Sequence, residues 1–127
     1  MAISPKRTSY GRADRRALVT EHAVGDGLGC TLKTSDWSAA TGVTDGLVPA
    51  MYPIVVDANG IGRPFAGTSG TPAALSGFTL NPVNVTDGDQ PVAYVWHGTV
   101  DPDLLPVDFD PTAVSGAATS RFVWAKA

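Results

Sequence analysis

Apolar positions in this chain occur in short runs separated by turns, and the runs are clearest after residue 46. "MYPIVVD" predicts a strand, "ANGIG" a turn whose glycines permit positive φ, and "IGRPFAG" a returning strand. "PVAYVWHGTV" predicts the strongest strand, because Val92, Tyr94 and Trp96 alternate with their neighbours. A hairpin followed by a further strand is the pattern of an antiparallel β body.

The remaining runs extend the same pattern to the C-terminus. "ALSGFTLNPVNVT" predicts a strand region interrupted by Gly77 and Pro82, "DGDQ" a tight turn, and "TSRFVWAKA" a final strand. "DPDLLPVDFDPTAVSGAA" contains prolines that permit one or two short helical turns at most. Asp101 and Asp110 each precede a proline, which favours an N-cap followed by proline at the first helical position.

These elements predict a mainly β fold, a small compact barrel-like or β-clip-like body at residues 46–127, with no room for a βαβ repeat. Trp96 and Trp124 are expected in its core on neighbouring strands, and Phe122 and Trp124 on one face of the last strand. The expected core residues are Ile54, Val56, Phe78, Leu80, Tyr94, Trp96, Phe122 and Trp124.

Residues 1–45 show no sustained period of 3.6 or 2, and "GDGLG" and "SDWSAATGVTDG" have a loop composition. "RADRRALVTEHAV" could form a short helix, which alone is marginal in water. We therefore expect an extended, largely disordered N-terminal arm that becomes ordered against a partner. Trp37 lies within this arm, where burial is not expected, and tryptophan is enriched at interface hot spots.

Composition supports this division. Gly 14 and Pro 10 favour turns and short strands over long helices. Residues 1–33 hold six basic and three acidic residues, net +3, whereas residues 34–127 hold three basic and nine acidic, net −6. A basic arm on an acidic body suggests that the two parts have different roles.

Cysteine content and hydropathy limit the class of protein. Cys30 is the single cysteine, so the chain has no internal disulfide and no CxxC metal site, and its role is open. The polar, basic start of the chain has no signal-peptide core. The longest apolar stretch, "LVPAMYPIVV", has ten residues with two prolines, too short to span a bilayer. We expect no membrane partner.

The densest candidate chemistry is His97 with Asp101 and Asp103, which could serve a small metal-dependent hydrolase. Zinc needs three or four converging ligands, and the spacing here lacks the EF-hand glycine and closing glutamate for calcium. Because short acids next to prolines also cap turns, we favour the structural interpretation. "GTSGT" misses the G-x-S-x-G elbow, and no P-loop lysine is present. We expect no enzyme activity, cofactor, metal or small-molecule substrate.

The basic arm has two possible partners. Arg and Lys could contact nucleic-acid phosphates with Tyr10 stacking, or the arm could lie on an acidic protein surface. The acidic remainder and the small number of cations favour a protein, so no direct nucleic-acid contact is expected. The candidate contact residues are Lys6, Arg7, Tyr10, Arg12, Arg15, Arg16 and Trp37.

Residues 45–127 resemble the lambda-type head decoration proteins of tailed bacteriophages. The resemblance is carried by "DGLVPAMYPIVVDANGIGRPF", "LSGFTLNPVNVTDGDQPVAYVWHGTVDPDLLP" and "RFVWAK". The matching segments are Ser76–Val85, Asp87–Gln90, Pro91–Gly98 and Val100–Pro106. The chain departs from the family pattern in its longer basic arm and in the two prolines of "VPAMYP".

The resemblance implies a structural protein of the virion. Such proteins are small β-rich bodies, usually homotrimers, on the outer surface of the expanded capsid. Their N-terminal arms bind the major capsid protein, and they stabilise the head against the pressure of packaged DNA without catalysis. A body of about 80 residues also gains stability from oligomerisation. The alternative within the same class is another virion module, such as a fibre base or tail component.

Overall fold

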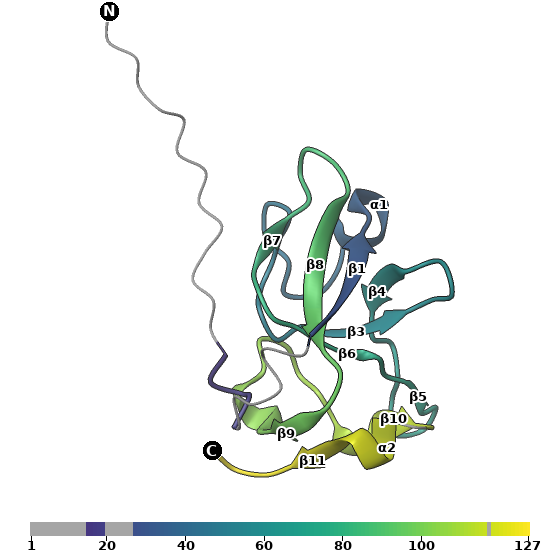
Figure 1. Ribbon diagram of the computed structural model, residues 1–127, viewed down its shortest axis with the longest axis vertical. Coiled ribbons are helices and arrows are strands. Elements are labelled where there is room, and N and C mark those ends of the chain that lie inside the picture. The colour runs from purple at the N-terminus through teal and green to yellow at the C-terminus, as the bar shows by residue number, and fades with distance from the viewer. Residues whose placement is uncertain (1–14, 20–26, 117) are drawn as a thin grey trace, which may run out of the picture.

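Five short strands close into a barrel at the centre of the molecule (Figure 1). The computed structural model describes residues 15–19, 27–116 and 118–127. Around the barrel the order is β1-β4-β3-β6-β8, and β8 pairs with β1 to close it. The barrel strands are β1 (Leu28–Leu32), β3 (Pro53–Val56), β4 (Ile61–Pro64), β6 (Gly77–Thr79) and β8 (Gln90–Val95).

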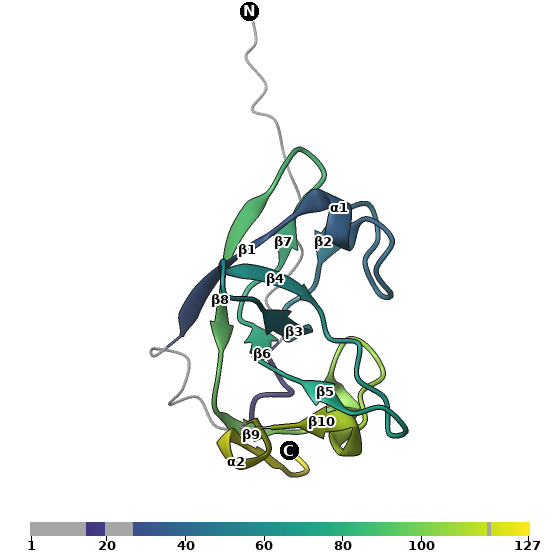
Figure 2. The same cartoon turned by 90° about the vertical axis from the view of Figure 1, so that its right-hand side faces the viewer.

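Shorter pairs and helical turns cover the two ends of the barrel. β9, β10, β11, β5 and α2 gather at one end, while α1 and the β7–β8 turn lie at the other (Figures 1 and 2). The paired strands are β2 (Leu47–Val48) with β7 (Val83–Asn84), β5 (Ala73–Ala74) with β10 (Val114–Ser115), and β9 (Gly98–Val100) with β11 (Phe122–Trp124). The helical turns are α1 (Thr34–Trp37), η2 (Pro102–Leu104), η3 (Pro111–Ala113) and α2 (Ala118–Arg121). The mainly β fold is as predicted.

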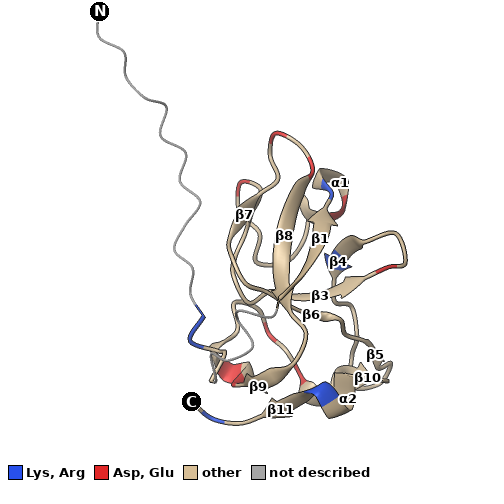
Figure 3. Cartoon of the chain, viewed as in Figure 1, with Lys and Arg blue, Asp and Glu red and all other residues tan. Residues whose placement is uncertain are grey.

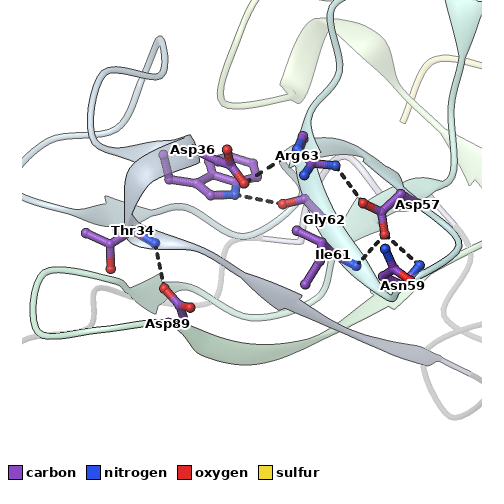
Figure 4. Close-up of polar contacts among 9 residues, drawn as sticks. Thr34, Asp36, Asp57, Asn59, Ile61, Gly62, Arg63 and Asp89 are labelled. Atoms are coloured by element: carbon purple, nitrogen blue, oxygen red, sulfur yellow. Dashed lines mark hydrogen bonds and ion pairs between the residues drawn. The ribbon is translucent and has the colours of Figure 1, made fainter.

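The β3–β4 hairpin shows why its sequence folds locally. Asp57 Oδ1 accepts the backbone N–H groups of Asn59 at 2.8 Å and Ile61 at 3.1 Å. Gly60 has a φ of +78°, which a glycine adopts without steric cost. Arg63 donates to the other carboxylate oxygen of Asp57 at 2.7 Å (Figure 4). The turn predicted at "ANGIG" is confirmed.

The strand predicted at residues 91–100 is divided in two. β8 ends at Val95 and β9 begins at Gly98, whose φ of +142° lies outside the range of an L-residue strand. The chain therefore turns away at Trp96 and His97, and β9 pairs with β11 instead of continuing the barrel. Period-2 alternation persists across a bend, so the sequence pattern could not reveal this break.

The buried side chains form two clusters. One includes Phe78, Val95, Val100 and Phe122, and the other includes Leu32, Trp37 and Ile54. Among the expected core residues, Ile54, Phe78, Leu80, Tyr94 and Phe122 are buried, and Val56, Trp96 and Trp124 are partly buried and packed against the clusters.

The placement expected for two tryptophans is wrong. Trp96 follows the end of β8 and packs against the Trp37 cluster, whereas Trp124 packs against the Phe78 cluster. β11 pairs with β9, so the two residues do not lie on neighbouring strands. The shared face of Phe122 and Trp124 is confirmed, since their rings stack with centroids 5.8 Å apart.

The boundary expected near residue 45 is also wrong. β1 pairs with β8 over its whole length and with β4 at Thr31 and Leu32, so residues 28–32 are a barrel strand. Cys30 and Leu32 alternate inward and are buried, and burial raises the pKa of the Cys30 thiol to about 11. Among the described residues, no helix is long and apolar enough to cross a membrane.

Candidate functional site

His97 and the aspartates that follow it do not converge. The His97 ring contacts the Trp96 ring with centroids 4.2 Å apart, and β9 separates His97 from Asp101. Within residues 15–19, 27–116 and 118–127, no three His, Cys, Asp or Glu side chains come together to hold a metal ion. The described part of the chain therefore gives no geometric support to the metal-dependent hydrolase alternative.

Asp101 has a structural role as the junction of three segments. Its side chain caps η2 by accepting the Asp103 N–H at 3.0 Å, and its second oxygen accepts the Ala127 N–H at 2.9 Å. Its own N–H donates to Ala17 O at 2.7 Å. Pro102 occupies the first position of η2, and Asp110 caps η3 in the same way before Pro111. The predicted capping by these aspartates is confirmed.

These hydrogen bonds favour the ionised carboxylates. The pKa of Asp101 lies below its ordinary value, chiefly because the Ala127 N–H donates to it, with further contributions from the Asp103 N–H and the Lys126 ammonium. The pKa of Asp110 is lowered mainly by the Thr112 hydroxyl and then by the Thr112 N–H. Both groups therefore stay charged in the folded chain at pH values where an unfolded aspartate begins to protonate.

We expect Asp101→Asn to lower the melting temperature by about 5 °C at pH 7, because the Ala127 N–H loses a charged acceptor. The folded pKa of Asp101 is the lower one, so its contribution is complete above about pH 5 and is lost as the pH falls below about 4. The variant should therefore lose less stability than the parent between pH 5 and pH 3. Thermal melts at a series of pH values measure both effects.

Asp87→Asn is the matched control, since Asp87 is an exposed carboxylate in the turn before β8. It makes the same charge change and should leave the melting temperature within about 1 °C of the parent. An Asp101→Asn chain as stable as this control at pH 7 would contradict the junction role.

The first described segment, residues 15–19, lies against the body. Arg15 donates from Nε to Leu80 O and from Nη2 to Asn81 Oδ1, both at 2.7 Å. Leu18 is buried and forms an antiparallel bridge with Val100. Arg15 thus has partners within its own chain. The candidates Lys6, Arg7, Tyr10 and Arg12 lie outside the described residues.

Trp37 is not an exposed anchor. Its side chain is fully buried, its ring meets the Tyr52 ring edge-on with centroids 4.8 Å apart, and Nε1 donates to Gly62 O at 3.0 Å. Asp36 and Arg63 form an ion pair over the same region, with 3.6 Å between Nε and Oδ2 (Figure 4). The interpretation of Trp37 as a capsid contact is therefore wrong, because tertiary contacts bury a side chain whose local sequence has no apolar period.

Two adjoining hollows were not predicted from the sequence. Their volumes are about 420 and 520 Å³, and both are lined by Gly67 and residues 107–110. Phe65 and Phe109 form the apolar wall of the first hollow, with ring centroids 5.5 Å apart. We call the combined depression the Phe109 groove. Its walls come from segments about forty residues apart, and the alternation of Asp and apolar residues in "LPVDFD" was its only local signal.

The acidic residues of the described chain lie outside its strands, in loops and helical turns (Figure 3). Asp103 forms an ion pair with Lys126, and both side chains are largely exposed. Asp108 and Asp110 are exposed at the Phe109 groove. This arrangement offers a negatively charged rim for a basic ligand and no converging acid–base pair.

No protein-family model matches the chain, and no curated protein matches its sequence.

Proposed function

We propose that the protein is a phage capsid decoration protein that binds the outer surface of the expanded head as a homotrimer and stabilises it against internal DNA pressure. The observation that carries this proposal is that the segments resembling the decoration family lie in one compact β body. Its partners are the major capsid protein and other copies of itself. The protein is made in the host cytoplasm and resides on the virion.

The junction at Asp101 supports a structural role. One carboxylate holds η2 and the C-terminus, while the adjoining N–H holds the segment that leads to the basic residues. A decoration protein under load needs its contact segment anchored to a rigid body. Asp101 meets that need, because it forms hydrogen bonds with Ala17, Asp103 and Ala127.

The contact residues of this proposal are Lys6, Arg7, Tyr10 and Arg12, with the exposed Arg16 next to the body. Arg15 anchors the start of the described body through Leu80 and Asn81. Many copies on one capsid add up modest single contacts into a stable shell. A basic contact segment on an acidic body suits an acidic receiving surface.

The test is cosedimentation with expanded and unexpanded capsids of the phage that carries the protein, after its mass in solution has been measured. The parent chain should be trimeric and bind expanded capsids. A chain lacking residues 2–13 should remain a trimer and keep its melting temperature. It should bind expanded capsids at least about tenfold more weakly, because it loses three cations and Tyr10.

Thr8→Ala with Ser9→Ala is the matched control, because it alters the same segment and keeps its charge. Undiminished binding by the shortened chain would refute the role of the segment. A parent chain that binds neither form of the capsid would refute the decoration function itself.

A further inference from the structure

The Phe109 groove has an apolar wall and an acidic rim. Phe65, Val107 and Phe109 supply the partly buried apolar surface, and Asp108 and Asp110 stand exposed beside it. Neither hollow has a lysine or arginine among its lining residues. A ligand that fits this surface carries positive charge together with an apolar or aromatic group.

The rim charges are not neutralised within the described chain. The Asp108 carboxylate forms no hydrogen bond or ion pair with residues 15–19, 27–116 or 118–127. Asp110 accepts hydrogen bonds from Thr112 and gains no cation there. Of the three aspartates that line the two hollows, Asp103 alone forms an ion pair within the described residues, with Lys126. The groove therefore has charge available for a basic partner.

We propose that the Phe109 groove binds residues 4–12 of the same chain, "SPKRTSYGR". This basic segment carries three cations and no acid, and Tyr10 adds an aromatic ring that suits the Phe65–Phe109 wall. Pro5 and Gly11 both disfavour a helix in this segment. The basic segment and the Phe109 groove are thus complementary in charge, and both carry aromatic groups.

The tether is short enough for this contact. Ala17 O accepts the Asp101 N–H, and Asp108 follows Asp101 by seven residues, so Asp108 lies within about 30 Å of Ala17. Eleven residues connect Lys6 to Ala17 and can span about 36 Å. Pro102 and Asp103, next to the anchoring hydrogen bond, already line the second hollow. Lys6 can therefore reach Asp108.

The tether also makes a weak contact sufficient. A short flexible linker gives an effective concentration of about 1 mM, so a free peptide with a dissociation constant near 1 mM would occupy the groove about half the time when tethered. An external partner of the basic segment must then compete with the groove. The contact is thus an autoinhibitory one, and it belongs to the free protein whether or not the decoration function is correct.

The experiment compares amide chemical shifts of the full chain with those of Lys6→Gln/Arg7→Gln/Arg12→Gln. The expected result is a set of shift differences centred on residues 67–69 and 107–110. The same signals should move in the Asp108→Lys chain and when NaCl is raised to about 0.5 M, because both weaken the charge attraction. Thr8→Ala/Ser9→Ala and Asp87→Lys are the matched controls and should leave these signals in place.

Several outcomes would overturn the proposal. Identical groove signals in the full chain and the triple variant would show that the basic segment does not bind there, as would differences centred on another surface. Differences that vanish on about tenfold dilution would assign the occupant to another molecule. Recovery of the groove signals in an isotope-labelled triple variant that is co-assembled with the unlabelled full chain would also assign the occupant to another molecule, because only the unlabelled chain carries the basic segment. Capsid cosedimentation reads out the decoration function separately.

Discussion

Trp37→Ala is expected to lower the free energy of unfolding by about 3–5 kcal/mol, the range for truncating a buried tryptophan. The side chain is fully buried, packs edge-on against Tyr52 and donates to Gly62 O on β4. Truncation leaves a cavity beside Tyr52 and removes the donor to the Gly62 carbonyl. Chemical denaturation followed by circular dichroism measures the change.

Trp37→Phe separates the hydrogen bond from the packing. It keeps most of the ring volume and loses the N–H donor to Gly62, so the expected loss is about 1–2 kcal/mol. If Trp37→Ala instead leaves stability unchanged and abolishes capsid binding, Trp37 is a contact residue and its assignment to the core is incorrect.

Gly77→Ala is the second substitution with a large expected effect, about 3 kcal/mol of destabilisation or failure to fold. Gly77 lies where β6 passes between β3 and β8. An added methyl group would overlap the Val95 carbonyl oxygen and lie 3.0 Å from the Tyr94 ring. Because the obstacle is mainly backbone, β6 and β8 would have to separate, which opens the barrel.

Gly29→Ala is the control for Gly77→Ala. It makes the same chemical change in another barrel strand, and a methyl group at Gly29 meets no atom within 4 Å. We expect its stability to stay within about 0.5 kcal/mol of the parent. Equal losses in the two variants would mean that backbone entropy, and not the close approach of β6 to β8, determines the effect.

The position of β1 changes how the protein can be shortened. A deletion of residues 2–40, which the composition of the chain suggests as removal of an arm, would remove a barrel strand and Trp37. A deletion of residues 2–13 keeps Arg15, Ala17 and Leu18, which contact the body. Experiments on the basic segment therefore need the shorter deletion or point substitutions.

Features set by neighbouring residues were predicted correctly. Asp101 and Asp110 cap turns whose next residue is proline, and Gly60 has the positive φ expected of the β3–β4 turn. The alternation in "PVAYVW" marks β8. In each case the partners are a few residues apart, so the stabilising contact is present within the sequence window that predicts it.

Features set by distant residues were missed. "LGCTLKT" alternates over only two inward positions, Cys30 and Leu32, and its glycine suggests a loop. Its strand conformation depends on pairing with β8, some sixty residues away, and with β4. The burial of Trp37 and the Phe109 groove depend on contacts of the same long range.

The sequence by itself determined the β character of the chain, its turns, its capping aspartates and the contrast between a basic start and an acidic body. These follow from local backbone preferences and from composition. The tertiary structure alone decided that β1 closes the barrel, that β8 and β9 separate at Gly98, and that no three metal-ligating side chains come together among the described residues. Strand pairing joins residues that no local pattern connects, because hydrogen bonding across a sheet places no constraint on their separation along the chain.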